Sequence, residues 1–242
     1  MFPETERART EQASSRPTSR LPLAPELPRS QSESGRTAQR ALDLVGATLG
    51  LAIGAPLMLM AAVGIRLNMG APVLFRQRRL GRYEQPFTLL KFRTMRAQGD
   101  RHGRPLTASQ RLTPTGRILR QLSVDELPQL WNVLRGEMSL VGPRPLYIEY
   151  LPYYTQRERK RHQVRPGLTG LAQISGRNRS QWDDRLETDV RYVEASCLWL
   201  DLRILMTTVV RVLRREDVMD TAIQGSLAKH RASRPTAPAA GK

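Results

Sequence analysis

The sequence predicts a mixed α/β, mostly helical, monotopic membrane protein with an N-terminal re-entrant helix and a small folded core that contains a minor β-hairpin. Three observations carry this prediction. The stretch from Leu44 to Ile65 has no charged residue, the residues after it alternate short apolar-periodic segments with loops rich in glycine and proline, and two short apolar runs flank a basic turn around Gly81. At 242 residues, the chain has the size of one ordinary domain with additional tails.

The composition divides the chain into four segments. Residues 1–35 are rich in Pro, Ser, Arg and Glu and poor in large apolar side chains, which predicts a disordered tail. Residues 36–66 are expected to form the membrane helix and residues 67–216 the folded domain. Residues 217–242 are expected to be a loose C-terminal tail.

The uncharged stretch is long enough, at roughly 33 Å as a straight helix, to cross a bilayer. Pro56 lies near its centre, where it removes a backbone hydrogen bond and kinks the helix. Arginines stand on both flanks, Arg40 before it and Arg66 after it, and the positive-inside rule then favours both ends on the cytoplasmic side. We therefore predict a hairpin that enters one leaflet and turns at Pro56. A plain span with a proline kink is the alternative.

The remaining elements are predicted to be short. Local periodicity and turn residues first indicate a hairpin of strands at 72–75 and 87–92, followed by a mobile loop at 98–111. A helix capped by Thr113 or Thr115 then runs through Arg120, and a basic helix is expected at 147–162. The last predicted elements are a strand at 171–174, a loop at 176–179 and helices at 182–194 and 198–215, with loose chain from about residue 225.

The helix at 198–215 has a broad apolar face and several arginines elsewhere. Such a helix could lie in the membrane interface with Trp199 at headgroup depth. A stripe of this kind more often packs into a core, and we predict core packing.

The charge of the chain is +17, and most of it belongs to the folded part. Such a surface suits a nucleic acid, an anionic membrane or a phosphorylated substrate. A single cysteine, Cys197, excludes an intramolecular disulfide, and three scattered histidines (His102, His162 and His230) disfavour a zinc centre. Any catalytic metal ion would therefore be a hard cation bound by carboxylates.

The segment from Ser123 to Gly136 indicates chemistry on a phosphate. It sets Asp125 and Glu126 at the start of a short predicted helix, and a rigid Gly-Pro-Arg-Pro loop with Arg144 follows soon after. Helix-end N–H groups and a guanidinium bind phosphate oxygens, while a carboxylate attacks or holds a metal ion. The predicted apolar face of this helix consists of Leu127, Leu130, Trp131 and Leu134.

Each of these residues also has a structural interpretation. Ser123 and Glu126 have the spacing of a capping box, and Asp125 could itself be the N-cap. Arg144 could serve only to pin its loop. Lys91, Arg93 and Arg165 could be ordinary surface cations.

Five motifs follow one another along the chain: Lys91-Phe-Arg-Thr-Met95, Asp125-Glu-Leu-Pro-Gln-Leu-Trp-Asn-Val-Leu134, Met138-Ser-Leu-Val-Gly-Pro-Arg-Pro145, Arg165-Pro-Gly-Leu-Thr-Gly-Leu-Ala-Gln-Ile174 and Leu200-Asp-Leu-Arg203. Together, over about residues 37–216, they resemble the bacterial sugar transferase family, the monotopic phosphoglycosyl transferases. The short N-terminus resembles the minimal form of that family, without the four extra membrane helices of larger members.

The resemblance implies transfer of a sugar 1-phosphate from a nucleotide sugar, usually a UDP-sugar, to undecaprenyl phosphate or a similar polyprenyl phosphate, with release of UMP. This reaction initiates the synthesis of exopolysaccharide, capsule, O-antigen or glycoconjugate. The resemblance places the folded domain at the cytoplasmic face of the bacterial inner membrane, in contact with membrane lipids. It specifies neither the sugar nor the oligomeric state.

The resemblance also assigns roles. It implies that Asp125 attacks the sugar-linked phosphate and forms a phosphosugar intermediate, with Mg²⁺ assisting. We expect Asp125 to be ionised because of the helix dipole and nearby arginines. Glu126 would hold Mg²⁺ together with Asp125, and Arg144 would clamp the diphosphate. Further candidates for phosphate binding are Lys91, Arg93, Arg165 and Asp201.

Two features of the membrane segment depart from the family pattern. The expected Ser-Pro pair is Ala55-Pro56, and the expected basic pair is Gln39-Arg40, which leaves Arg40 alone to meet a lipid phosphate near Asp43. A nucleic-acid-binding protein is disfavoured because aromatic residues make up only 5% of the chain and no known binding motif occurs. The alternative that stays open is a catalytically inactive membrane scaffold of the same fold.

Overall fold

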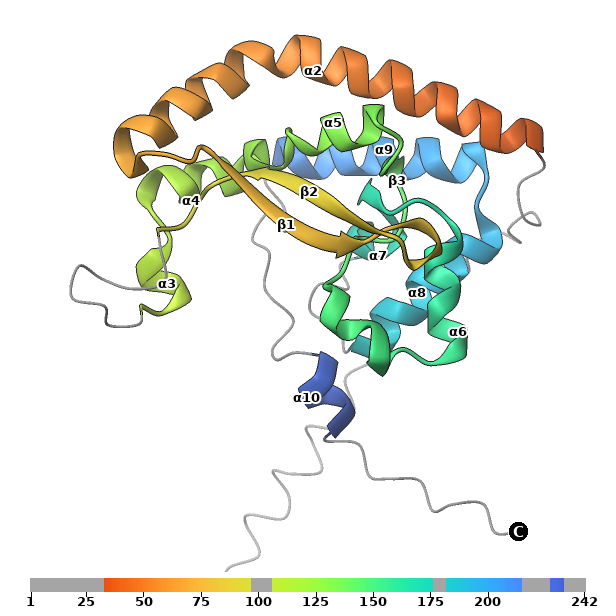
Figure 1. Cartoon of the computed structure of the whole chain (residues 1–242). Helices are drawn as coiled ribbons and strands as arrows, with labels where there is room; N and C mark the ends of the chain where they lie inside the picture. The colour runs from red at the N-terminus through yellow and green to blue at the C-terminus, as the bar shows by residue number, and fades with distance from the viewer. Residues whose placement is uncertain (1–32, 97–105, 176–181, 215–226, 233–242) are drawn as a thin grey trace, which may run out of the picture.

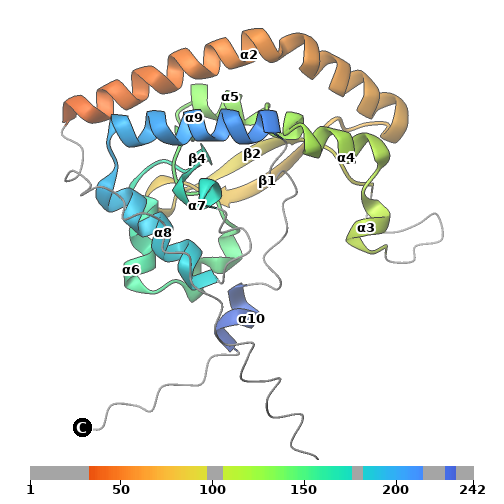
Figure 2. The same ribbon diagram turned by 180° about the vertical axis from the view of Figure 1, so that it is seen from behind.

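The computed structural model of the chain describes residues 33–96, 106–175, 182–214 and 227–232. One long helix, α2 (Glu33–Met69), arches over a set of shorter helices and two small sheets (Figure 1). In the view from behind, α9 (Leu198–Arg214) lies beneath the same helix (Figure 2). The described part is mostly helical, which confirms the predicted fold class at this level.

Helix α2 continues without a break through Pro56. The hairpin turn predicted at this residue does not interrupt the helix. The helix curves along its length instead (Figure 1). A proline removes one hydrogen bond, and the turns on either side of it can remain helical. The helix is long and apolar enough to cross a membrane, and most of that stretch is not buried in the protein.

The first turns of α2 are fixed to the folded domain by a buried carboxylate. Asp43 is 2% exposed, and its Oδ1 accepts hydrogen bonds at 2.8 Å from both Ser139 Oγ and the Leu140 backbone N–H. Burial raises the pKa of Asp43, although these two donors act in the opposite direction. Asp43 thus joins α2 to β3 through two buried hydrogen bonds.

The predicted hairpin is confirmed, with a longer first strand. Strand β1 (Leu74–Leu80) pairs with β2 (Pro86–Phe92) in antiparallel register, from Leu74 opposite Phe92 to Leu80 opposite Pro86. At its tip lies the short 3₁₀ turn η1 (Arg82–Glu84). The second sheet was not predicted. It consists of β3 (Ser139–Val141) and β4 (Gly167–Thr169), which pair in parallel.

A close approach of two glycines makes the second sheet possible. A Cβ atom added to Gly167 would lie 2.1 Å from the backbone N of Gly142, so a side chain has no room there. The strand predicted at 171–174 is wrong, since Leu171–Ile174 forms the helical turn α7. The strand lies just before it, over residues too few to show a periodicity of their own.

Several helices match their predictions. Thr113 caps α4 (Pro114–Gln121) by accepting from the Gly116 N–H, and the long helices α8 (Trp182–Ala195) and α9 have nearly the predicted bounds. The helix predicted at 147–162 is divided into η3 (Ile148–Tyr153), α6 (Gln156–Arg159) and η4 (Lys160–Gln163). Part of the predicted loop at 98–111 is the short helix α3 (Ala108–Arg111), and the predicted loop at 176–179 lies outside the described residues.

The C-terminal segment also differs from its prediction. Residues 227–232, expected to be loose, form the helix α10 (Leu227–Ala232), and Leu227 is fully buried. It packs with Trp182 and Tyr154 beside η3. The main core lies elsewhere, between α5 (Gln129–Leu134), β3, α8 and α9, and includes Leu130, Val133, Met138, Val141, Tyr192, Leu200 and Ile204.

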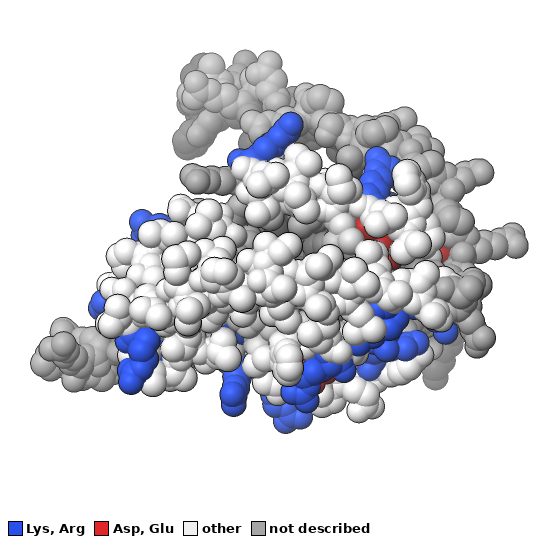
Figure 3. All heavy atoms as spheres, turned by 90° about the horizontal axis from the view of Figure 1, so that it is seen from above, with Lys and Arg blue, Asp and Glu red and all other residues white. Residues whose placement is uncertain are grey.

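The prediction that the apolar face of α9 packs into the core is wrong for much of that face. Trp199 and Leu213 are each 77% exposed, and Met206 is 66% exposed. Seen from above α2, the molecule presents a broad uncharged face with Lys and Arg side chains toward its margin (Figure 3). On the described part of the chain, the exposed large apolar side chains of α2 and α9 include Val45, Leu49, Ile53, Leu59, Met60, Leu67, Trp199, Met206, Val209 and Leu213.

Candidate active site

The two adjacent carboxylates lie on a single 3₁₀ turn, η2 (Val124–Glu126), which leads into α5. Ser123 precedes the turn with φ of 54°, in the left-handed region, and its side chain makes no capping hydrogen bond. The capping box considered for Ser123 and Glu126 is therefore not formed. The predicted apolar face of the helix is also shifted, since Leu130 and Val133 are buried but Trp131 is 51% exposed.

Glu126 binds two cations that come from distant parts of the chain. Its Oε1 lies 2.6 Å from Lys91 Nζ on β2 and 2.7 Å from a terminal nitrogen of Arg144 in the Gly-Pro-Arg-Pro loop. Burial acts to raise the pKa of Glu126, but Arg144 and Lys91 outweigh it and hold the pKa well below its usual value. Glu126 is thus an anion fixed between two cations. The structure brings together these three predicted site residues.

Asp125 has a different environment. It is 8% exposed, and its carboxylate makes no hydrogen bond or ion pair with another described residue. Burial and the adjacent charge of Glu126 raise its pKa to about 6, while Lys91, Arg120 and Arg144 act in the opposite direction. Asp125 was expected to be ionised with the help of a helix dipole and nearby arginines; the nearby cations do favour the anion, but burial and Glu126 outweigh them and raise the pKa. A turn of three residues provides little dipole, and burial removes the water that would solvate the anion.

The two carboxylates are the protein groups available for a metal ion at this place. Among the described residues, no group of three or more His, Cys, Asp or Glu side chains gathers in a way that could hold one. Mg²⁺ is commonly bound by one or two carboxylates together with waters and substrate phosphates. The uncommitted carboxylate of Asp125 fits that type of site better than Glu126, whose Oε1 already accepts from Lys91 and Arg144.

Arg120 belongs to this region and was not predicted as a site residue. It lies on the last turn of α4, and its charge is close enough to Asp125 to act on the pKa of that carboxyl. Its Nε donates to Thr94 Oγ1 at 3.1 Å. Its position five residues before Asp125 could have suggested a role at the site. The direction of its side chain could not be inferred from the sequence, because it depends on the left-handed backbone at Ser123.

Asn132 was also missed, and it positions the strand that carries Lys91. It is 1% exposed on α5, where its Oδ1 accepts from the Leu90 N–H at 3.1 Å and its Nδ2 donates to the Thr88 carbonyl at 2.8 Å. The side chain thus imitates a neighbouring strand along the edge of β2. It fixes the distance between that strand and the helix that follows the two carboxylates.

Arg93 does not join the carboxylates. Its guanidinium donates to the carbonyls of Met69, Gly70 and Ala71 at the C-terminal end of α2. Met69 is the last residue of α2, and its carbonyl is one that a helix end leaves without an intrahelical partner; a cation there also interacts favourably with the helix dipole.

Arg40 and Arg165 lie at the opposite end of α5 from the carboxylates. Arg40 donates to the Val133 and Leu134 carbonyls at 2.7 and 2.8 Å, and Arg165 Nε donates to the Gly136 carbonyl at 2.9 Å. In this structure, Arg40 therefore contacts a helix end rather than standing free near Asp43 for a lipid phosphate. Gly136 follows the end of α5 with φ of 79°, a left-handed conformation that glycine adopts readily after a helix.

Asp201 is fully buried and separate from the other predicted phosphate-binding residues. Its carboxylate accepts from the Tyr192 hydroxyl at 2.7 Å and from Gln39 Nε2 at 2.9 Å. Burial raises its pKa to about 7. Asp201 thus joins α9 to α8 and α2 inside the core. Pro56, the other predicted hairpin residue, is exposed on α2.

Comparisons with known proteins show which family the chain resembles. The profile of the bacterial sugar transferase family matches residues 34–215. An uncharacterized sugar transferase of Bacillus subtilis, EpsL, is 49% identical over 183 residues, which cover 76% of this chain and 91% of that protein. The UDP-glucose:undecaprenyl-phosphate glucose-1-phosphate transferase of Caulobacter vibrioides is 45% identical over 189 residues, which cover 74% of this chain and 71% of that protein. The exopolysaccharide production protein ExoY of Rhizobium meliloti is 39% identical over 195 residues, 74% of this chain and 86% of its own. This chain belongs to the bacterial sugar transferase family.

Proposed function

We propose that this protein transfers a sugar 1-phosphate from a UDP-sugar to undecaprenyl phosphate or a similar polyprenyl phosphate, releases UMP, and so initiates the synthesis of a cell-surface polysaccharide. The observation that carries the proposal is the pair of carboxylates: Asp125 is buried and uncommitted, while Glu126 beside it holds Lys91 and Arg144. Relatives named for this type of transfer support it. They also disfavour the alternative of an inactive scaffold.

The reaction has two displacements at the same phosphorus atom. In the first, an oxygen of Asp125 attacks the sugar-linked phosphorus of the donor, the bond to the neighbouring phosphate breaks, and UMP leaves with the electron pair. In the second, an oxygen of the polyprenyl phosphate attacks the same phosphorus and the carboxylate of Asp125 leaves. The nucleophile must be ionised, and its pKa of about 6 leaves it mostly ionised near neutral pH.

Lys91 and Arg144 supply positive charge where the diphosphate must bind. Both reach the same oxygen of Glu126, so the two cations converge beside Asp125 before a substrate arrives. Cations that are positioned in advance can stabilise charge that develops on phosphate oxygens without a further cost of reorganisation. In this proposal Glu126 orients the two cations.

Mg²⁺ would be held by Asp125, with Glu126 as a second possible ligand. When bound, it would neutralise negative charge on the diphosphate and on the departing UMP. Arg120, close to Asp125, adds a further positive charge to this region.

We place the protein at the inner membrane, with the carboxylates on the cytoplasmic side and α2 entering and leaving through one leaflet. The support is the exposed apolar surface of α2 and α9, with Trp199 among its most exposed side chains. Apolar patches of this extent mark interaction surfaces, and an interfacial helix commonly carries a tryptophan on its apolar face.

A turnover assay tests the proposed function. Purified full-length protein in nanodiscs is supplied with Mg²⁺, undecaprenyl phosphate and, in turn, UDP-glucose, UDP-galactose and UDP-N-acetylgalactosamine. We expect at least one donor to give UMP release. Repeated turnover should require the acceptor, undecaprenyl phosphate. The absence of UMP release with every UDP-sugar tried, from protein shown to be folded, would contradict the proposal.

A further inference from the structure

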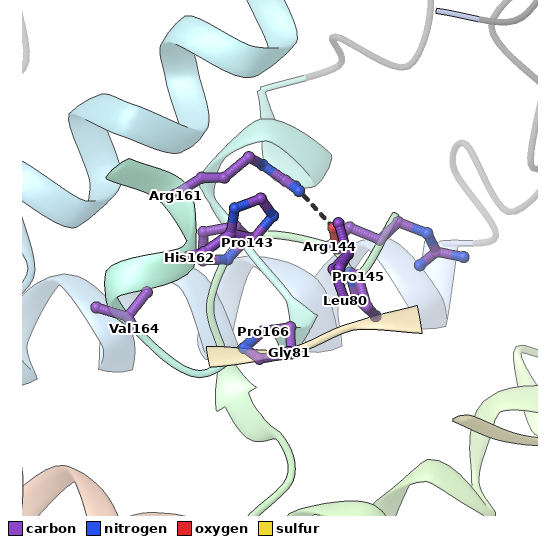
Figure 4. A pocket seen from close by; sticks show the side chains of 9 residues that line it. All are labelled: Leu80, Gly81, Pro143, Arg144, Pro145, Arg161, His162, Val164 and Pro166. Atoms are coloured by element: carbon purple, nitrogen blue, oxygen red, sulfur yellow. Dashed lines mark hydrogen bonds between the residues drawn. The ribbon is translucent and has the colours of Figure 1, made fainter. Parts of the chain in front are cut away.

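We propose that Arg161, held by Asp189, is a positioning residue for Arg144. Neither Arg161 nor Asp189 is among the site residues that the sequence indicated, and the inference rests on the proposed function for its kinetic test. The juxtaposition is visible in Figure 4, where Arg161 donates to the backbone carbonyl of Arg144 and the side chain of Arg144 extends away from it.

The contact between Arg161 and Asp189 is fully buried. Both side chains are 2% exposed, and Asp189 Oδ2 accepts from Arg161 Nη2 at 2.8 Å and from its Nε at 3.2 Å. Arg161 lies on η4 and Asp189 on α8, so the pair joins two elements across the interior. An ion pair in this setting is weak evidence for stability, because well-packed apolar residues could often replace it without loss.

What the buried pair provides is a fixed donor. Arg161 Nη2 donates to the Arg144 carbonyl at 2.7 Å, and the same nitrogen also donates to Asp189. An arginine guanidinium is planar and rigid, so a contact with Asp189 also fixes the direction of its other N–H bonds. The carbonyl of Arg144 is therefore bound by a group that has little freedom to move.

The surrounding backbone makes this contact effective. The prolines at 143 and 145 fix their own φ, and each restricts the residue before it. Gly142 N–H donates to the Thr169 carbonyl at 2.9 Å, and the Pro143 carbonyl accepts from Gly167 N–H at 3.0 Å. With the Arg144 carbonyl held as well, three consecutive residues of the loop are anchored. The direction in which the Arg144 side chain leaves the backbone is thereby set.

The consequence reaches the carboxylates. Arg144 contacts Glu126 at 2.7 Å, and Glu126 is adjacent to Asp125. A small displacement of a positioned group can reduce a rate by about a hundredfold. The chain of contacts thus runs from Asp189 through Arg161 and the Arg144 backbone to Glu126, and Arg161 acts without touching a substrate.

A double-mutant cycle tests this inference. Arg161→Lys keeps a cation for Asp189 but loses the rigid fork, and it is combined with Arg144→Ala. The full-length protein in nanodiscs is assayed with the UDP-sugar that gives turnover, and the Kd for UDP is measured in parallel. We expect Arg161→Lys to lower kcat/KM about ten- to a hundredfold on its own, and by no more than about twofold in the Arg144→Ala background.

Two controls separate positioning from general loss of structure. Arg231→Lys changes another ion-paired arginine, which is bound to Asp183 and Glu158 and, within the described part of the chain, makes no hydrogen bond or ion pair with the loop of Arg144. Its kcat/KM should remain within about twofold of the unchanged protein. If Arg161→Lys lowers the thermal midpoint too far to assay, Asp189→Asn, which retains Arg161 and the shape of the acid, takes its place in the cycle.

The inference can fail independently of the proposed function. An equal loss of kcat/KM from Arg161→Lys in both backgrounds would overturn positioning, even though the unchanged protein turns over. If no donor gives turnover, hydrogen–deuterium exchange of the peptide spanning residues 139–147 decides. Faster exchange in Arg161→Lys than in Arg231→Lys supports positioning, and equal exchange overturns it.

Discussion

Asp125 and Glu126 are neighbours in the chain, yet their carboxylates have opposite surroundings. Glu126 Oε1 accepts from Lys91 at 2.6 Å and from Arg144 at 2.7 Å, whereas Asp125 has no hydrogen bond or ion pair within the described residues. Burial is the larger cause of the raised pKa of Asp125, and the negative charge of Glu126 is the second. One carboxylate is committed to organising cations, and the other is left for chemistry.

The pH dependence of catalysis should report Asp125. Its pKa of about 6 means that the ionised nucleophile predominates above this pH and is lost as the pH falls through it. We therefore expect kcat/KM to decline below about pH 6, in the limit about tenfold per pH unit, as measured by UMP release.

Glu126→Gln should move this acidic limb to lower pH, because it removes a neighbouring negative charge. The control Glu187→Gln, which affects an exposed ion pair with Arg157, should leave the limb in place. A rate that is flat between about pH 5 and 7 would exclude Asp125 as the titrating nucleophile.

Asn132 should contribute strongly to stability. Asn132→Ala would leave the Leu90 N–H and the Thr88 carbonyl without their side-chain partner, at a cost of about 2–3 kcal/mol in the free energy of unfolding. For a chain of this size, the thermal midpoint should fall by about 5 °C or more. Asn68→Ala is the matched control, since Asn68 is exposed and, among the described residues, its side chain donates only to the Gly64 carbonyl on its own helix. Equal midpoints for the two variants would show that the edge of β2 does not depend on Asn132.

The path of α2 through the membrane can be tested by labelling. In a Cys197→Ser background, Ala38→Cys and Asn68→Cys place one thiol near each end of the helix. If α2 enters and leaves through one leaflet, a membrane-impermeant maleimide should label both thiols from the cytoplasmic side only. Labelling from opposite sides would establish a spanning helix and refute the re-entrant path.

The exposed face of α9 should contact lipid. A single-tryptophan protein that retains Trp199, with phenylalanine at positions 131 and 182, is reconstituted into nanodiscs that contain brominated lipid. We expect bromine to quench the emission of Trp199, which is 77% exposed, and to leave a protein that retains only Trp182, which is 5% exposed, nearly unaffected. Equal emission of the Trp199 protein with and without bromine would remove α9 from the membrane interface.

Local signals in the sequence predicted much of the fold. The hairpin, the cap at Thr113, and the helices α8 and α9 all depend on periodicity or on a single turn residue. The second sheet could not be predicted in this way, because β3 and β4 have three residues each and depend on the contact between Gly142 and Gly167. A contact of that kind joins distant residues and leaves no periodic pattern.

The same distinction applies to the site. The motifs predicted that Asp125, Glu126, Arg144 and Lys91 matter, and the structure brings them together. Residue type alone did not distinguish an arginine beside the carboxylates from one at a helix end, which is where Arg93 lies. Likewise, an aspartate in a motif gives no sign of whether it faces a substrate or, as Asp201 does, a buried tyrosine hydroxyl. Those outcomes depend on tertiary packing.

The role of Asp125 as nucleophile is tested most directly by incubating the protein with Mg²⁺ and its UDP-sugar donor in the absence of any polyprenyl phosphate. We predict release of UMP in an amount equal to the enzyme, together with a phosphosugar adduct that mass spectrometry maps to Asp125. Asp125→Asn should give neither, while it remains folded in the same nanodiscs. Normal turnover with acceptor present, but no UMP and no adduct without it, would contradict Asp125 as the nucleophile and indicate a direct displacement instead.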